Sequence, residues 1–345
     1  MTNLENYLSA FTESDWNAAI DTLLPSIHEV DKNAVRIWFR FFPLSLIRTI
    51  EAAEDRDSTL HAFAMQGDFE LKNKIDTSHH FLYGHRYWPT VKAAVEAEAV
   101  VFAGHTHDLA EEIRDVAILV AEKLKVDRSL VNGIVAVGLA TLNQVGLEAF
   151  HAAPGKVETI IGIMAKTPEA VIAERAKDDS QGLFGFLKTV DKKFSVTYDN
   201  LRNNSKFPVM DGQEVATASS KNLTGKFKEE DDRCWEGVIP VECLSASCGT
   251  CWIGVLGGQE KLSDVRPRER RQLQVFGYDV SDEPKPFIRL ACQAKAEGNV
   301  SIVIPPWNAV FGKKVYGNIE ELELEPATTS AKVLRETIAT AAKSE

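Results

Sequence analysis

Residues 243–251 read CLSASCGTC and contain three of the five cysteines in a chain of 345 residues. The spacing is C-x4-C-x2-C, and Cys292 follows 41 residues after Cys251 on a segment that the pattern predicts to be a strand. Together Cys243, Cys248, Cys251 and Cys292 supply the four thiolates that a [2Fe–2S] cluster requires. These cysteines decide the interpretation of the second half of the chain.

The short spacings within 243–251 predict a loop that folds around a metal cluster. Backbone N–H groups between the ligands then point toward the sulfides and stabilise the negative charge added on reduction. Gly249 suits a backbone that passes close to the inorganic core. The hydroxyls of Ser245, Ser247 and Thr250 are further candidate donors to the sulfurs.

The second half of the chain resembles a plant-type [2Fe–2S] ferredoxin domain. The resemblance rests on the loop 243–251, on the Trp-Ile-Gly-Val exit strand that starts at Trp252, on the segment 289–293 around Cys292, and on a closing strand at 299–304. It covers roughly residues 190–310 and implies a β-grasp fold, a mixed sheet wrapped over a helix with the cluster near one surface. The first part of the chain resembles no family that we recognise.

Three features depart from that family. Ala246 stands where the family usually has glycine, and the interval from Cys251 to Cys292 is longer than usual, with an insertion expected around 258–285. The segment 219–232 before the loop is also enlarged. None of these departures removes a ligand, but each changes the surroundings of the cluster.

Two other interpretations of the cysteines stay open on the sequence alone. A structural zinc site also takes four cysteine ligands, although zinc sites usually join two short cysteine pairs. A disulfide framework is the other alternative. Cys234, beside Trp235, is expected to be a buried apolar residue outside the site.

The remaining pattern predicts an α+β chain in two domains. Apolar residues at helical spacing predict an all-helical domain over 1–182, with helices from Ser14, over 31–42, from Thr106 or Asp108, over 129–151 and from 167–168. The small residues of the 129–151 helix predict a central position. Alternation predicts strands at 194–198, 207–210, 252–256, 287–294 and 300–304, with a helix at 267–276, in a domain over 190–317. An acidic tail follows at 318–345.

Charge and hydropathy exclude several classes of function. The chain has 39 Lys plus Arg against 50 Asp plus Glu, a net charge of −11, which argues against a nucleic-acid partner. No apolar stretch in the sequence reaches the ~20 residues of a membrane span, and the N-terminus lacks the features of a secretory signal. We therefore expect no membrane span and a cytoplasmic location.

Five histidines gather in one interval of the helical half, and they are His79, His80, His85, His105 and His107. Imidazole is a common metal ligand, so these residues could bind haem or a metal, although none of the five is the histidine of an E-x-x-H pair. Packing, capping or solvation is the simpler interpretation. The nearby aromatic residues, Phe81, Tyr83, Tyr87 and Trp88, are expected to be core.

The sequence thus predicts a one-electron carrier, or an electron-transfer subunit, that serves an oxidoreductase partner. Such a protein needs no catalytic acid, base or nucleophile, and the absence of a glycine-rich phosphate loop argues against a built-in flavin or nicotinamide site. One alternative is an oxidoreductase whose helical domain binds haem or a metal, and another is a zinc-stabilised scaffold. A basic group near the cysteines, Arg266, Arg268, Arg270 and Arg271, is either a docking patch for an acidic partner or a solvated helix face.

Overall fold

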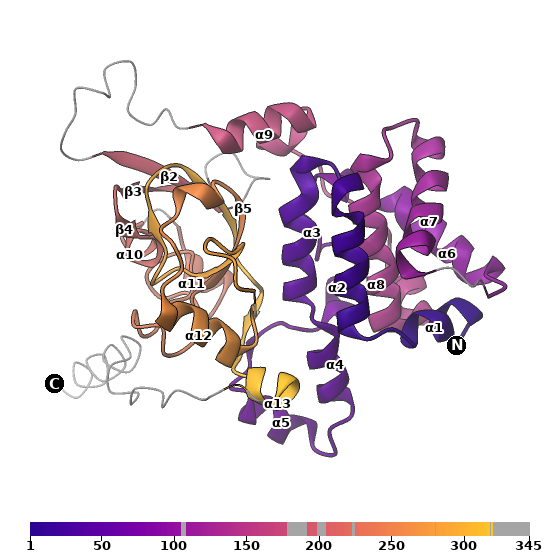
Figure 1. Cartoon of the computed structure of the whole chain (residues 1–345), viewed down its shortest axis with the longest axis horizontal. Helices are drawn as coiled ribbons and strands as arrows, with labels where there is room; N and C mark the ends of the chain where they lie inside the picture. The colour runs from indigo at the N-terminus through magenta and orange to yellow at the C-terminus, as the bar shows by residue number, and fades with distance from the viewer. Residues whose placement is uncertain are drawn as a thin grey trace. The chain divides into compact units, whose positions relative to one another are not determined.

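The computed structural model describes residues 1–104, 108–177, 192–198, 205–222, 225–279, 281–317 and 319. Contacts divide these residues into two compact units (Figure 1). The first unit consists of Met1–Ala52 and Phe69–Glu174 and is helical. The second unit consists of Ala53–Asp68 and the described residues from Arg175 onward, and it contains a mixed sheet. The expected two-part α+β layout is therefore confirmed.

The helices of the first unit are α1 (Asn3–Ser9), α2 (Glu13–Leu23), α3 (Glu29–Phe41), α4 (Leu44–Glu51), α6 (Trp88–Val101), α7 (Leu109–Leu124) and α8 (Ser129–Ala152), and α9 (Pro168–Ala176) follows them. The predicted helices correspond to α2, α3, α7, α8 and α9, whereas α1, α4 and α6 lie where no helix was predicted. Asp108 caps α7 by accepting a hydrogen bond from the Glu111 amide at 2.8 Å, one of the two starts that the sequence allowed. The N-cap of α2 is Thr12 rather than Ser14. The Thr12 hydroxyl accepts from the Asp15 amide, and the Asp15 carboxylate accepts from the Thr12 amide, which makes a capping box.

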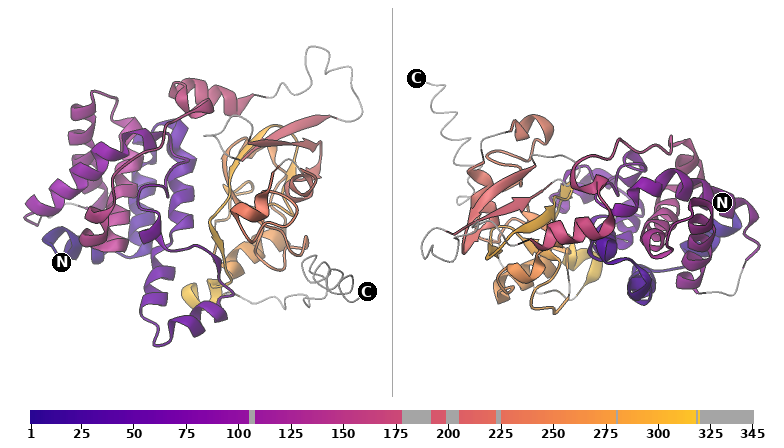
Figure 2. Two further views of the ribbon diagram at one scale, coloured as in Figure 1. Left: turned by 180° about the vertical axis from the view of Figure 1, so that it is seen from behind. Right: turned by 90° about the horizontal axis from the view of Figure 1, so that it is seen from above.

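Helix α8 runs through the middle of the helical unit and contacts α1, α3, α6 and α7 (Figures 1 and 2). Its small residues allow this approach: a Cβ on Gly133 would lie 2.5 Å from Val35, and one on Gly138 would lie 3.2 Å from Val91. Among the described residues, α8 is the one helix long and apolar enough to cross a membrane, and 67% of its apolar window is buried in the unit. A mostly buried core helix of a soluble protein meets the same criteria of length and composition.

The sheet of the second unit has five strands in the order β3-β2-β8-β5-β6. Its members are β2 (Lys193–Thr197), β3 (Lys206–Met210), β5 (Trp252–Gly257), β6 (Ile288–Leu290) and β8 (Val300–Val303). Neighbouring strands are antiparallel except for β2 and β8, which are parallel. Helix α10 (Val215–Ser220) contacts β3, and α12 (Pro267–Phe276) contacts β6. Shorter elements complete the unit: α5 (Arg56–Ala62), β1 (Gln66–Gly67), β4 (Gln213–Glu214), α11 (Phe227–Glu230), β7 (Lys295–Ala296), β9 (Trp307–Asn308) and α13 (Gly312–Tyr316).

One segment of the N-terminal half belongs to the second unit. Strand β1 pairs with β9 through Gln66 opposite Asn308, and the Phe63 carbonyl accepts a hydrogen bond from the Val310 amide at 2.7 Å. The Phe63 ring is buried and lies 6.3 Å from the Phe311 ring. The sequence pattern predicts one helical domain over 1–182, and the structure differs from it here, because β1 pairs with a strand about 240 residues further along the chain.

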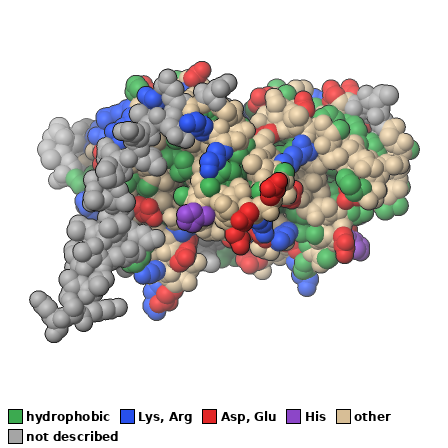
Figure 3. Space-filling model, turned by 90° about the horizontal axis from the view of Figure 1, so that it is seen from below, with side chains coloured by type: hydrophobic (Ala, Val, Ile, Leu, Met, Phe, Trp, Pro, Cys, Tyr) green, Lys and Arg blue, Asp and Glu red, His purple; other side chains and the backbone are tan. Residues whose placement is uncertain are grey.

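Two other parts of the sequence analysis fall outside the described residues. These are the junction around 178–191 and, apart from residue 319, the acidic tail at 318–345. On the face drawn in Figure 3, acidic and basic side chains are interspersed with apolar ones.

Candidate metal centre

The register of two strands brings the distant Cys292 to the cysteine loop. Strand β5 begins directly after Cys251, and β6 ends two residues before Cys292. The two strands are antiparallel, with Trp252 opposite Leu290, and the Ala291 amide donates to the Cys251 carbonyl at 2.8 Å. A separation of 41 residues in sequence therefore becomes a direct contact in space.

The sulfurs of the four predicted ligands interact with one another, Cys248 with both Cys243 and Cys251, and Cys292 with both Cys251 and Cys243. The thiol of Cys248 donates to Cys243, and this bond, helped by neighbouring amides, lowers the pKa of Cys243 to about 5 and raises that of Cys248. The thiol of Cys251 donates to Cys292, which raises the pKa of Cys251 and lowers that of Cys292. All five cysteines, the excluded Cys234 among them, are free thiols, so the disulfide interpretation is not what the structure has.

Polar groups of the loop point at these sulfurs. The amides of Ser245 and Ser247 donate to the Cys243 sulfur at 3.4 and 3.2 Å. The hydroxyl of Thr250 lies 3.0 Å from the Cys248 sulfur, and the Ser245 hydroxyl also lowers the pKa of Cys243. The donors expected from the sequence are thus present, except that Ser247 donates to the Cys243 sulfur from its backbone amide while its hydroxyl lies 2.9 Å from that of Ser245.

The loop turns around its sulfurs by using left-handed backbone conformations. Leu244, Ala246 and Gly249 have φ angles of 55°, 61° and 74°. The value at Ala246 explains why glycine would suit this position, since a Cβ is unfavourable in that region. At Gly249 a Cβ would also lie 3.1 Å from the side chains of Phe276 and Tyr278, so this turn packs closely on the structure beneath it.

The insertion that the sequence placed at 258–285 contributes the floor of the loop. Tyr278 stacks on Trp252 with ring centroids 4.1 Å apart and an interplanar angle of 11°. Its hydroxyl lies 2.8 Å from the carbonyl oxygens of Gly249 and Ala309 and accepts from the Ala309 amide at 3.0 Å. Burial raises the pKa of Tyr278, so its proton stays on the oxygen as a hydrogen-bond donor. Sequence analysis did not single out this residue.

A buried ion pair fixes the strand that leads to Cys292. Arg289 donates from Nε and Nη2 to the two carboxylate oxygens of Glu269, at 2.8 and 2.9 Å. Glu269 also accepts from the Leu290 amide at 2.9 Å, and Arg289 donates to the Ser263 carbonyl at 2.7 Å. The pair joins α12 to β6, and the only indication in the sequence was that Arg289 is the first residue of the fourth-ligand segment 289–293.

Cys234 behaves as the sequence suggested. Its side chain is buried, burial raises its pKa to about 12, and its thiol donates to the Val238 carbonyl at 3.2 Å. A protonated, hydrogen-bonded thiol of this kind is a poor nucleophile and a poor ligand.

Two of the five clustered histidines contact each other. The Nδ1 atoms of His79 and His85 lie 2.9 Å apart, and His79 Nε2 lies 3.2 Å from the Ile75 carbonyl. Burial lowers the pKa of His85 to about 4 and that of His79 well below its usual range. His80 bonds the Thr77 carbonyl at 2.9 Å instead. The other two histidines, at 105 and 107, lie outside the described residues.

In the part of the chain that the structure describes, no three His, Cys, Asp or Glu side chains are arranged to hold a single metal ion. This finding covers the histidine interval and the cysteines alike. The expected aromatic core is present, with Phe81, Tyr83 and Trp88 buried and Tyr87 half-buried.

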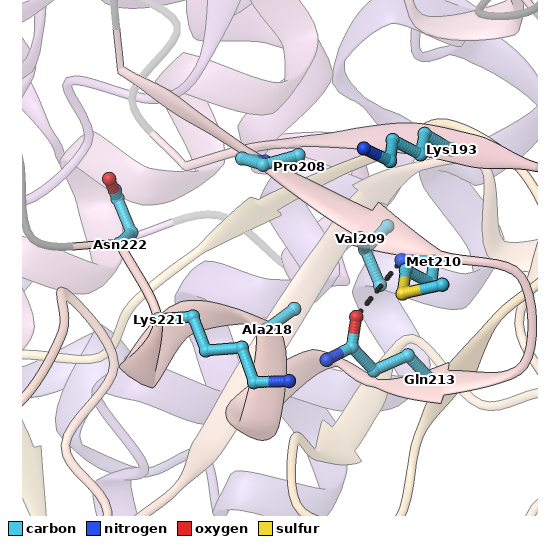
Figure 4. A pocket seen from close by; sticks show the side chains of 8 residues that line it. All are labelled: Lys193, Pro208, Val209, Met210, Gln213, Ala218, Lys221 and Asn222. Atoms are coloured by element: carbon cyan, nitrogen blue, oxygen red, sulfur yellow. Dashed lines mark hydrogen bonds between the residues drawn. The ribbon is translucent and has the colours of Figure 1, made fainter. Parts of the chain in front are cut away.

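A groove of about 550 Å³ lies at the other edge of the sheet (Figure 4). It is lined by the edge strand β3 and by α10, and in it the Gln213 side chain accepts from the Met210 amide at 3.0 Å. Lys193 and Lys221 flank an apolar surface that includes Val209. The groove contains none of the predicted site residues.

Comparisons with family models, curated proteins and solved structures found no match to this chain. The assignment of a function therefore depends on the chemistry and geometry of the site.

Proposed function

We propose that the chain holds a [2Fe–2S] cluster on Cys243, Cys248, Cys251 and Cys292 and transfers single electrons. The observation that carries this proposal is the register of β5 and β6, which brings Cys292 to the loop that contains Cys243, Cys248 and Cys251. A [2Fe–2S] cluster takes four thiolates, and these four cysteines would supply them.

The spacing of the cysteines favours an iron–sulfur cluster over the zinc alternative. Structural zinc sites usually join two short cysteine pairs. Here the fourth cysteine, Cys292, stands alone on a distant segment that the pairing of β5 with β6 brings to the loop.

The surroundings of the sulfurs suit a centre that gains and loses charge. Amide donors from Ser245 and Ser247 stabilise negative charge on the Cys243 sulfur, and hydrogen bonds to sulfur are one determinant of cluster potential. Cys251 and Cys292 are 2% and 4% exposed. The protein thus offers a dry, donor-lined site on one side of the loop.

The architecture of the second unit supports a β-grasp fold for this domain. A mixed five-stranded sheet packs against a helix. The strands of this sheet that come first and last along the chain, β2 and β8, lie next to each other and are parallel. The cysteine loop leads into the third strand of this sheet, β5, as the ferredoxin resemblance implies. In this proposal the insertion 258–285 is an addition that supports the loop.

The proposed reaction is outer-sphere electron transfer with no group of the chain acting as acid, base or nucleophile. The four cysteines would hold the cluster, which would supply one-electron redox chemistry between a donor and an acceptor. The helical unit would serve to attach the carrier to its oxidoreductase. A haem or metal site there has less support, because His79 and His85 bond each other.

The test is to purify the chain anaerobically and measure its iron, sulfide and zinc. We expect two iron and two sulfide per chain, and a rhombic paramagnetic resonance signal after reduction with dithionite. Folded protein that contains one zinc ion and no iron would overturn the proposal. A Soret band in the absorbance spectrum would instead favour a haem enzyme.

A further inference from the structure

We infer that Gln272 donates a hydrogen bond from its side-chain amide to a sulfur of the bound cluster and thereby raises the reduction potential. This inference rests on the proposed function, because it concerns the cluster proposed above. Gln272 lies on α12, inside the insertion 258–285, and no pattern in the sequence singles it out. It adds a donor from outside the cysteine loop to the donors that the loop itself supplies.

The side chain of Gln272 is buried, and its oxygen lacks a donor. The residue is 2% exposed, and its Oε1 atom has no hydrogen-bond partner among the residues that the structure describes. A buried oxygen of this kind is unfavourable, because it gives up its bonds to water and gains none in return. Such groups are rare in folded chains, and a redox centre or a bound ion beside them is one reason for their presence. What lies next to Gln272 therefore decides its role.

The residues one turn before and one turn after Gln272 both contact the cysteine loop. With 3.6 residues per turn, Gln272 lies about 40° around α12 from Arg268 and about 40° from Phe276. Arg268 donates to the Ser247 hydroxyl at 3.2 Å, and a Cβ on Gly249 would lie 3.1 Å from the Phe276 ring. These two turns of α12 therefore contact the loop on either side of its second cysteine.

A third neighbour defines the other side of Gln272. Glu269 lies about 60° from Gln272 around the helix, on the side away from the loop contact of the preceding turn. It accepts from the Leu290 amide at 2.9 Å and pairs with Arg289 on β6. Gln272 thus lies between the flank of α12 that contacts the loop and the flank that contacts the strand leading to Cys292. Its amide is directed to the corner where the four cysteines come together.

The cluster changes what this corner offers to an amide. Cysteines lose their thiol protons when they bind metal, and the bound sulfurs then accept hydrogen bonds rather than donate them. The NH₂ group of Gln272 has two donors for such acceptors. A half-turn about the last bond of the side chain brings this group to the place of the oxygen, and it keeps the packing because both ends of the amide have nearly the same shape.

A donor at a sulfur favours the state with more negative charge, which is the reduced cluster. Gln272 therefore makes the cluster easier to reduce. The structure already shows one glutamine in such a role, because the Gln293 side chain donates to the Cys292 sulfur at 3.5 Å. Two glutamine amides, one from α12 and one beside the fourth ligand, would then surround the sulfurs.

Redox titration of the intact chain tests the effect on the potential. Q272M keeps the length of the side chain and removes its donors. We expect its equilibrium constant for reduction to fall about tenfold, which is a decrease of about 59 mV for one electron. Q274M makes the same change about 200° around the helix, at a half-buried position, and should keep the native potential. An unchanged potential in Q272M, or an equal decrease in Q274M, would overturn the inference.

Hyperfine spectroscopy of the reduced, paramagnetic cluster detects the donor directly. The chain is produced with nitrogen-15 only in its glutamine side-chain amides, so that every coupled nitrogen belongs to a glutamine beside the cluster. Two couplings are expected, from Gln272 and Gln293, and Q293M should keep one of them. A residue that only supports the packing of α12 would give no such coupling. Absence of any coupling in Q293M would therefore overturn the inference, even if Q272M failed to fold.

The two proposals fail in different ways. Protein without a reducible cluster gives neither a potential nor a paramagnetic signal, and this result would contradict the proposed function itself. A normal cluster whose potential and nitrogen couplings are the same in Q272M and in the native chain would leave the proposed function in place. It would overturn only the role of Gln272.

Discussion

Glu269 and Arg289 form an ion pair in which both side chains are 0% exposed, and the carboxylate also accepts the amide of Leu290. Two parallel N–H to oxygen bonds give this pair a fixed geometry. Because Glu269 lies on α12 and Arg289 on β6, the pair joins the insertion to the strand that leads to Cys292.

Removal of one member of this pair should destabilise the second unit strongly. Arg289→Met leaves a buried carboxylate without its cation, and we expect a loss of about 3–5 kcal/mol in the free energy of unfolding. Urea denaturation followed by tryptophan fluorescence measures it. The double variant E269L/R289M should recover much of the loss, because no charge is then left buried. Arg266→Met, at an exposed position that directly precedes α12, is the control, and an equal loss there would contradict the explanation.

Single Cys→Ser substitutions at positions 243, 248, 251 and 292 should each abolish a stable cluster. A hydroxyl is a much weaker ligand than a thiolate, so we expect bound iron to fall from about two per chain to less than about a tenth of that. Iron analysis and visible absorbance after anaerobic purification measure it. Cys234→Ser should keep full iron content, since its thiol bonds the Val238 carbonyl and lies outside the site. Loss of iron in Cys234→Ser would mean that the ligand set is wrong.

Tyr278→Phe should weaken the support of the cysteine loop. The variant keeps the stacking on Trp252 but leaves the Ala309 amide without its hydroxyl acceptor, for a cost of about 1–3 kcal/mol. Urea denaturation measures this cost. The midpoint potential of the cluster should shift too, because the Gly249 carbonyl loses a donor. Tyr316→Phe, on a partly exposed ring, should change neither quantity.

Phe63→Ala should loosen the C-terminal sheet although residue 63 lies in the N-terminal half. Removing this buried ring creates a cavity against Phe311, with an expected cost of about 3–5 kcal/mol. Hydrogen exchange should be faster for residues 307–311, including the Val310 amide that bonds the Phe63 carbonyl. Leu119→Ala, at an exposed position of α7, is the control. Unchanged exchange in 307–311 would contradict the assignment of Ala53–Asp68 to the second unit.

The buried histidine pair should make the helical unit sensitive to acid. The pKa of His85 is about 4 when folded and near 6.5 when unfolded, so the unfolded chain binds more protons between these values. Stability is therefore full above pH 6.5 and is lost as the pH falls toward 4, by about 3 kcal/mol for this residue. Urea midpoints at pH 7 and pH 4.5 measure it. His85→Gln should lose less stability over this interval than the native chain, whereas the exposed His151→Gln should match the native chain.

The sequence by itself determined the features that depend on neighbouring residues. Apolar periodicity and caps predicted most helices of the first unit, and the 267–276 pattern predicted the bounds of α12. The sequence also identified the four candidate cysteine ligands and the hydrogen-bond donors between them. Three of these cysteines and all of these donors lie within one loop of nine residues, 243–251. The electron-transfer function remains a proposal that rests on these local features.

The tertiary structure alone decided how distant parts meet. The approach of Cys292 to Cys251, the Tyr278 hydrogen bonds to the loop, the Glu269–Arg289 pair and the pairing of β1 with β9 all join residues far apart in sequence. No local pattern encodes such contacts, since they depend on which buried donors, acceptors and apolar faces satisfy one another once the sheet has formed. For the same reason the sequence grouped four arginines together, and only the tertiary structure shows that Arg270 donates to the carbonyls of Ser281 and Glu283 in a neighbouring turn.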